Sequence, residues 1–130
     1  RYGVMHRKSY LSSPIVLKET YQAKNRENLF FAGQLTGVEG YVESCASGLI
    51  AGINMALLMQ EKEPICFGNT CVMGSQAYYI THCDPKHFQP MNANFGIMHL
   101  NEKCKKHERK EKLASQALSR IQEIKEQVNG

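Results

Sequence analysis

The feature that most constrains the fold is a strand, a glycine-rich turn and a helix within residues 29–56. The unbroken apolar run 29–32 predicts a short parallel strand that is buried on both faces. Gly33, Gly37 and Gly40 follow in a turn, and the next residues repeat with helical spacing. This order is typical of the ligand-facing unit of a doubly wound sheet. We therefore expect an α/β fold.

Two stripes run along the predicted helix. The first is apolar and is expected to face the core; it consists of Val38, Tyr41, Val42, Cys45, Leu49, Ile53 and Leu57. The second recurs at every fourth position with small side chains; it consists of Gly40, Ser44, Gly48, Gly52 and Ala56. Glycine inside a helix costs about 1 kcal/mol relative to alanine, so this bare stripe needs a reason. Close packing on a sheet and contact with a flat ligand both supply one.

Three stretches, 31–34, 36–44 and 48–54, resemble the C-terminal FAD-contacting segment of one flavoprotein family. That family is the folate- and FAD-dependent tRNA (uracil-5-)-methyltransferases, relatives of the glucose-inhibited division flavoproteins. The resemblance implies the C-terminal part of a Rossmann-like FAD-binding domain. It also implies FAD contacts from Gly33, Gln34, Thr36, Gly37, Val38, Glu39, Gly40 and Tyr41. Gly33 and Gln34 would lie near the ribityl chain and residues 36–41 near the ring, while the small stripe would mainly pack the helix on the sheet.

The resemblance extends to residues 1–7 and to the loop 88–96. It implies that His6, Asn92 and Asn94 lie near the folate or the flavin. From the residues alone, the simpler explanation is that His6 is a half-exposed histidine of a strand over 2–10 and that both asparagines bond their own backbone. We expect residues 1–22 to end an inserted domain or form its boundary strand, and residues 23–130 to belong to the flavin domain.

The remaining segments predict further elements. Residues 15–28 read as a short strand or edge followed by a loop, and the long helix should end near 61–63, before Pro64. A second helix is predicted over 70–81 and a final one over 103–128. The apolar stripe of the final helix consists of Leu113, Ala117, Ile121, Ile124 and Val128. Its first half is dense in positive charge, for which pairing such as Glu108 with Lys112 is the simpler explanation and phosphate contact the alternative.

The chemistry implied by the resemblance is methylation of carbon 5 of a uridine in RNA. The methylene would come from methylenetetrahydrofolate and the electrons from FAD, which NADH or NADPH would reduce. The substrate would be the T-loop of tRNA or, alternatively, ribosomal RNA; the wobble-uridine flavoproteins are the nearest other assignment. The family's essential cysteines lie upstream of this region, and the sequence lacks a G-x-G-x-x-G fingerprint for the pyrophosphate. We therefore expect the N-terminal flavin-binding half as a partner, and the chain alone to be catalytically silent.

Composition leaves two other kinds of protein open. A zinc module could draw on Cys66, Cys71, Cys83 and His87, although their spacing fits no common zinc motif. A small RNA-binding module could use the basic final helix, since the net charge is +4. The cysteines predict a reducing, cytoplasmic setting, and the apolar run 49–59 is too short to span a membrane. Because the chain begins at Arg1, we expect it to be part of a longer protein.

Overall fold

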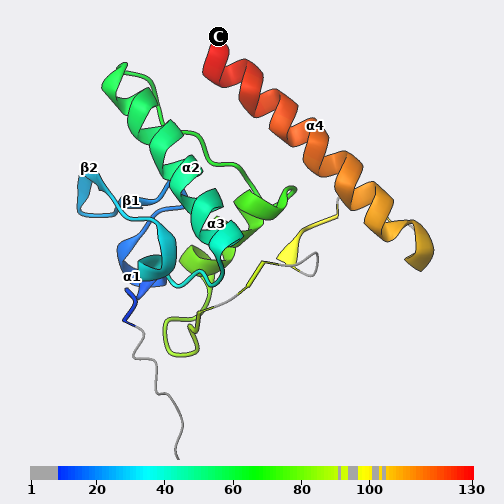
Figure 1. Cartoon of the computed structure of the whole chain (residues 1–130), viewed down its shortest axis with the longest axis horizontal. Helices are drawn as coiled ribbons and strands as arrows, with labels where there is room; N and C mark the ends of the chain where they lie inside the picture. Colours follow the sequence, from blue (N-terminus) through cyan, green and yellow to red (C-terminus); the bar gives the residue numbers. More distant parts are fainter. Residues whose placement is uncertain (1–8, 91, 94–96, 101–102, 104) are drawn as a thin grey trace, which may run out of the picture.

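The computed structural model describes residues 9–90, 92–93, 97–100, 103 and 105–130. Most of the strand predicted over 2–10 lies outside these ranges, and Ser9 and Tyr10 are not in a strand. Figure 1 shows the described elements, which in chain order are α1 (Ser13–Val16), β1 (Gln22–Ala23), β2 (Arg26–Phe30), the 3-10 helix η1 (Gly33–Thr36), α2 (Tyr41–Met59), α3 (Val72–His82), the 3-10 helix η3 (Lys106–Glu108) and α4 (Arg109–Asn129).

The sheet differs from the prediction. β1 and β2 form an antiparallel pair in which Gln22 faces Phe30 and Ala23 faces Arg26, with an irregularity between the two pairs. The predicted parallel strand buried on both faces is therefore wrong for the described chain, because β2 ends at Phe30 and its first four residues are exposed. The partner of β2 is β1, which directly precedes it in the sequence. The strand expected at the start of 15–28 is also wrong, since Pro14 occupies the first turn of the short helix α1.

Helical periodicity in the sequence correctly predicted the two helices in the middle of the chain, α2 and α3. α2 and α3 confirm the helices expected after Gly40 and over 70–81. α4 begins at Arg109 rather than at 103, because Lys105 has an extended backbone and a 3-10 turn comes before the α-helix. Arg120 fastens α4 to the loop before α3. Its Nε donates to the carbonyl of Phe67 at 3.0 Å and its Nη2 to that of Cys66 at 2.8 Å.

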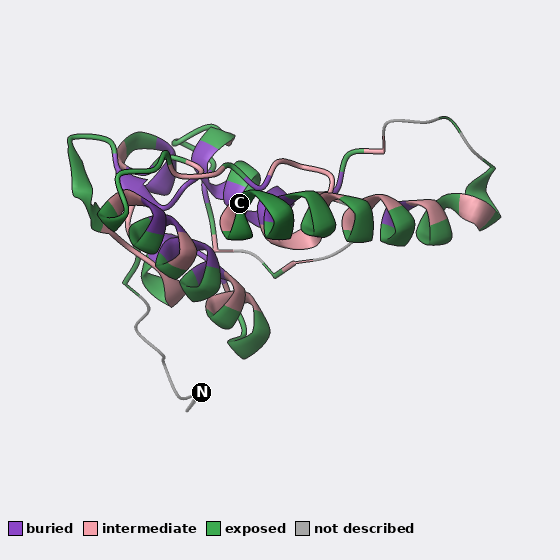
Figure 2. Cartoon of the chain, turned by 90° about the horizontal axis from the view of Figure 1, so that it is seen from above, coloured by how far each residue is buried: buried purple, intermediate pink, exposed green. Residues whose placement is uncertain are grey.

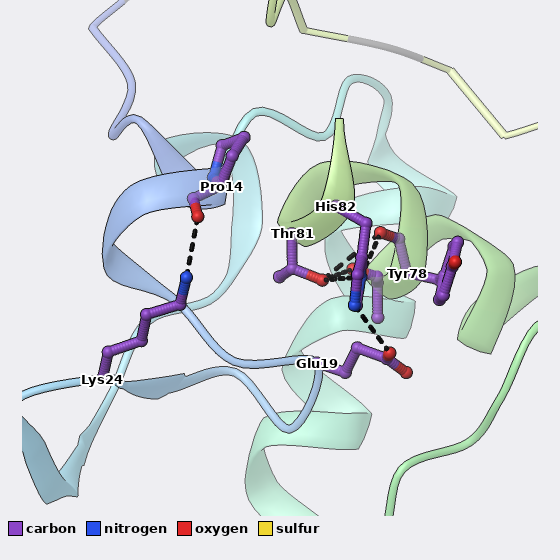
Figure 3. A network of polar contacts seen from close by, with 7 residues as sticks. Pro14, Glu19, Lys24, Tyr78, Thr81 and His82 are labelled. Carbon is purple, nitrogen blue, oxygen red and sulfur yellow. Dashed lines mark hydrogen bonds and ion pairs between the residues drawn. The ribbon is translucent and has the colours of Figure 1, made fainter. Parts of the chain in front are cut away.

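The core lies between α2, α3 and the segment that precedes β1, with one contribution from α4. Its buried members are Leu17, Tyr21, Val38, Ile50, Ala51, Phe67, Cys71, Ala77, Ile80, Phe88 and Ile124. Polar contacts also join the N-terminal segment to α3 (Figure 3). His82 Nε2 lies 3.5 Å from Glu19 Oε1, and the His82 ring stacks on Tyr78 at a centroid distance of 4.1 Å. The segment around Glu19 is thus held against the C-terminal end of α3.

The side of α2 that faces the core is not the one predicted. Ser47, Ile50, Ala51, Asn54 and Leu57 are buried, whereas most of the predicted apolar stripe is exposed. Tyr41 is 96% exposed, Val42 79% and Met59 80%. Both sides of this helix carry apolar or small residues, so periodicity alone could not select the core side. The exposed bands are visible in Figure 2.

The small stripe of α2 does not pack on a sheet in the described chain. At Gly48 and Gly52, no described atom lies within 4 Å of the position that a Cβ would take. The whole of α2, Tyr41–Met59, extends beyond the run 49–59 and is long and apolar enough to cross a membrane. By length and composition alone this is weak evidence, because the core helices of water-soluble proteins meet the same criteria.

Candidate functional site

The candidate site is the turn between β2 and α2, which is fixed to the helix that follows it. Gly33, Gly37 and Gly40 have φ values of 76°, 91° and 96°, a region that favours glycine. The N–H of Gly33 donates to Ser47 Oγ at 2.7 Å, and Ser47 Oγ donates to the carbonyl of Ser44 at 2.7 Å. Ser47 thereby ties the start of the turn to the second turn of α2.

One half of the turn is filled by the chain's own residues. Thr36, Gly37 and Val38 are buried. A Cβ on residue 37 would overlap the ring of Phe88. Packing within the chain therefore favours glycine at position 37, independently of any ligand. The hydroxyl of Ser13 donates to the carbonyl of Thr36 at 2.6 Å. These residues can reach a ligand through their backbone at most.

The other half of the turn is open. No described atom lies within 4 Å of a Cβ placed on Gly33, and Gln34, Gly40 and Tyr41 are exposed. At Gly40 the carboxylate of Glu43 lies where a Cβ would be. Glu39 is partly buried and has an interaction of its own. α2 begins at Tyr41 without a side-chain cap on its first turn. Its N–H groups and its partial positive charge suit an anionic or electron-rich ligand atom.

The loop after α3 lies against this turn. The ring of Phe88 covers Gly37, and the ring of Tyr10 meets Phe88 edge-on at 5.8 Å. The N–H of Ala93 donates to Glu43 Oε1 at 3.2 Å, which holds the loop at the first turn of α2. Asn92 is exposed beside this contact, whereas Asn94 and His6 lie outside the described residues.

Glu43 is the functional residue that sequence reasoning missed. Its carboxylate accepts from Ala93, and its carbonyl accepts from Gln76 Nε2 at 3.3 Å. It therefore joins α2, α3 and the loop. An acidic residue in the first turn of a helix that follows a glycine-rich turn was the available signal. Its partner, 50 residues further along the chain, carried none.

Cys66, Cys71 and Cys83 are not arranged as activated thiols. Burial raises the pKa of Cys71, which accepts the N–H of Gly74 at 3.4 Å and so caps α3. Burial also raises the pKa of Cys66 and of Cys83. Cys45, expected to be packed inside, is exposed on α2 because the helix turns its other side to the core.

The zinc alternative gains no support from the described residues, in which no three His, Cys, Asp or Glu side chains are grouped to hold a metal ion. Cys71 is occupied as a helix cap. His87 is exposed, and its Nδ1 lies 3.0 Å from Asp84 Oδ2.

The sequence of the chain is similar to those of known proteins. Residues 1–63 match the model of the family described as Glucose inhibited division protein A. The methylenetetrahydrofolate–tRNA-(uracil-5-)-methyltransferase TrmFO of Bacillus licheniformis is 60% identical over 126 residues, 95% of this chain and 29% of its own length. The protein of the same name from Enterococcus faecalis is 62% identical over 120 residues, 91% of this chain and 28% of its own length. The chain thus spans under a third of the length of these relatives.

A solved structure resembles the chain in fold. The structure of Aquifex aeolicus GidA in its form II crystal aligns with a TM-score of 0.53 and 22% sequence identity. The alignment covers 84% of this chain and 17% of that one. At this identity the likeness concerns the fold, which is mixed α/β.

Proposed function

Because the chain belongs to the family of folate- and FAD-dependent tRNA (uracil-5-)-methyltransferases, we propose that it is the C-terminal part of the flavin domain of such an enzyme. The observation that carries the proposal is 60% identity to a named relative over 95% of the chain. The reaction would move a methylene from methylenetetrahydrofolate to carbon 5 of a uridine in the T-loop of tRNA, where it ends as a methyl group. This would take place in the cytoplasm.

The open half of the turn fits a flavin. Gly33 has free space at its Cα, Gln34 can donate and accept hydrogen bonds, and the first turn of α2 has no side-chain cap. We assign Gly33 and Gln34 to the ribityl chain, and Gly40, Tyr41 and the N–H groups of α2 to the ring. Thr36, Gly37 and Val38 would support the ring from behind. FAD, when bound, supplies the electrons that reduce the methylene to methyl, and NADH or NADPH would reduce FAD.

The chain's own residues would position substrate at this edge. Glu43 holds the backbone of Ala93 and so fixes the loop that carries Asn92. From there the amide of Asn92 would hydrogen-bond the folate or flavin edge, together with Asn94 and His6. The ring of Tyr41, 96% exposed, would cover the flavin and exclude water.

The nucleophile should come from another part of the protein. Attack on the uracil ring needs a thiolate, and burial raises the pKa of Cys66, Cys71 and Cys83. A thiol with a raised pKa is mostly protonated near neutral pH. The family resemblance implies that the essential cysteines lie upstream of this region, and the raised pKa values of these three thiols are consistent with that assignment.

The exposed side of α2 would be covered by the N-terminal flavin-binding half. Val42, Leu49 and Met59 leave a large apolar surface, and Gly48 and Gly52 leave room for a backbone to approach closely. Relatives more than three times as long have the residues to cover it. We place the boundary with the inserted domain before Leu17 instead of after residue 22, since Leu17 and Tyr21 pack in the same core as Ile50.

The test uses the full-length protein in a strain whose own gene is deleted. Restoration of 5-methyluridine at the T-loop of tRNA, together with a flavin spectrum of the purified protein, is the expected result. 5-Methyluridine in ribosomal RNA alone would favour the ribosomal alternative. A change at the wobble uridine with no 5-methyluridine would overturn the proposal. The 130-residue chain alone should form no 5-methyluridine.

A further inference from the structure

The positive charge of the chain is concentrated at one end of α4. Residues 103–112 contain six lysines and arginines and two glutamates, a net charge of +4 that equals the net charge of all 130 residues. Lys105, Lys106, Arg109 and Lys110 are exposed. The end of α4 that carries them reaches beyond the rest of the described chain (Figure 2).

These cations are not neutralised by the helix itself. Among the described residues, Lys105, Lys106, Arg109 and Lys110 make no ion pair, and Glu108 pairs with His107 at 3.8 Å. Pairing on the helix surface therefore does not account for this group. Four unpaired cations within six residues repel one another, and a polyanion would remove that cost.

A polar groove continues from this end along α4. It has a volume of about 570 Å³, and α4 lines one side with Lys112, Ser115, Gln116, Ser119, Arg120 and Glu123. Gly68, Asn69 and Thr70 form part of the other side. Within the described chain, the hydroxyls of Ser115 and Ser119 have no hydrogen-bond partner. Gln116 donates to the carbonyl of His99, and Arg120 donates to those of Phe67 and Cys66, so the two serine hydroxyls are the groove groups best placed to contact phosphate and sugar.

We propose that Lys105, Lys106, Arg109 and Lys110 bind phosphates of the RNA substrate and that the groove beside them receives the adjoining sugar–phosphate backbone. This rests on the proposed function, which makes RNA the substrate. An anionic membrane is a poorer fit, because residues 105–112 include no exposed apolar side chain that could enter the lipid. No aromatic residue accompanies the cations, so the surface contacts the backbone rather than the bases and orients RNA without reading its sequence.

The test compares two variants of the full-length enzyme, each of which loses three lysines and one arginine. In the cluster variant, Lys105, Lys106, Arg109 and Lys110 become alanine. In the matched control, Lys18, Arg26, Lys86 and Lys125, which are exposed on other parts of the chain, become alanine. The probe is unmodified tRNA, and its affinity is measured from about 50 to 200 mM salt. Each phosphate contact contributes about 0.7–0.9 to the slope of log affinity against log salt, so removing four contacts should lower the magnitude of the slope by about 3–3.6.

The cluster variant should raise KM for tRNA at least about tenfold, while flavin content and the rate of NADH or NADPH oxidation without tRNA stay unchanged. A variant with arginine at 105, 106 and 110 and lysine at 109 should restore the affinity. Equal losses in the cluster and control variants would overturn the inference, because net charge alone would then explain binding. Cluster-dependent binding to vesicles of anionic phospholipid, with RNA affinity unchanged, would also overturn it. Absence of 5-methyluridine with the unsubstituted enzyme would instead refute the proposed function.

Discussion

The side chain of Asn54 pairs with both backbone groups of Ile65. Its Nδ2 donates to the Ile65 carbonyl at 3.1 Å, and its Oδ1 accepts the Ile65 N–H at 2.7 Å. The same Nδ2 donates to the carbonyl of Thr20 at 3.2 Å. Asn54 is completely buried in α2, so one amide joins the segment before β1, the middle of α2 and the segment that follows α2. A buried polar group of this kind is stabilising only while all of its partners are present.

Asn54→Ala should therefore lower the free energy of unfolding by about 2–4 kcal/mol, because it leaves one buried and two partly buried backbone groups without a partner. Urea denaturation of the chain measures this change. Met55→Ala is the matched control, since Met55 follows it on the same helix and is 42% exposed. The control should change the free energy by less than about 1 kcal/mol. Equal effects of the two substitutions would show that the Asn54 network adds nothing to stability.

Two glycines in helices should respond to alanine in opposite directions. A Cβ at Gly74 in α3 would overlap the carbonyl oxygen of Gly68 and come too close to Phe67. Because these are mainly backbone atoms that cannot move aside easily, Gly74→Ala should lower the free energy of unfolding by more than about 2 kcal/mol. Gly48 in α2 has open space, so Gly48→Ala should stabilise this chain by about 0.5–1 kcal/mol. Thermal unfolding of both variants measures these effects.

The same Gly48 substitution also tests whether the N-terminal half covers α2. In the full-length protein, an approaching backbone would occupy the space at Gly48, and Gly48→Ala should become neutral or destabilising. If it stabilises both proteins equally, the exposed side of α2 is not covered at this position.

The sequence sufficed to predict what depends on neighbours along the chain. α2 and α3 follow from helical spacing and from the breakers beside them. The side of α2 that faces the core did not follow, because both sides are apolar or small. The apolar run 29–32 predicts a strand of a parallel sheet, yet β2, which overlaps this run, pairs with the adjacent antiparallel strand β1.

The contacts that assemble the candidate site could not be predicted from periodicity either. Gly37 meets Phe88 and Glu43 meets Ala93 across about 50 residues of chain. No local pattern encodes such pairs, since they depend on how α2 and α3 pack. The resemblance to a family was the only signal in the sequence that related the turn to the loop.

Replacing the phenol of Tyr21 by the ring of phenylalanine should increase the stability of the chain. Its hydroxyl is buried and has no hydrogen-bond partner among the described residues, so Tyr21→Phe removes an unsatisfied polar atom and should stabilise the chain by about 1 kcal/mol. Phenylalanine would keep the φ of 67° at this position, so the backbone strain stays the same in both proteins. Urea denaturation at neutral pH measures the difference. A loss of stability would mean that a partner of the hydroxyl exists in solution.

Tyr21 should also govern stability at high pH. Burial raises the pKa of its phenol above the ordinary value of 10.0. The folded state therefore holds this proton more tightly than the unfolded state does. This contribution is fully present below pH 10.0 and is lost as the pH rises above it. The stability of the unsubstituted chain should fall more steeply than that of Tyr21→Phe between about pH 9 and 11. Parallel curves would contradict the assignment of this titration to Tyr21.

A substitution at Tyr41 should affect flavin binding but not the stability of the fold. Because its side chain is 96% exposed, Tyr41→Ala should leave the stability of the 130-residue chain within about 0.5 kcal/mol. In the full-length protein the same change should lower flavin content, because the ring would no longer cover the cofactor. Flavin absorbance of the purified protein measures this. Ile15→Ala, which also removes an exposed apolar side chain, 59% exposed in α1, is the control and should leave flavin content unchanged. Full flavin content with Tyr41→Ala would remove Tyr41 from the flavin site and leave the turn residues Gly33 and Gln34 as its contacts from this chain.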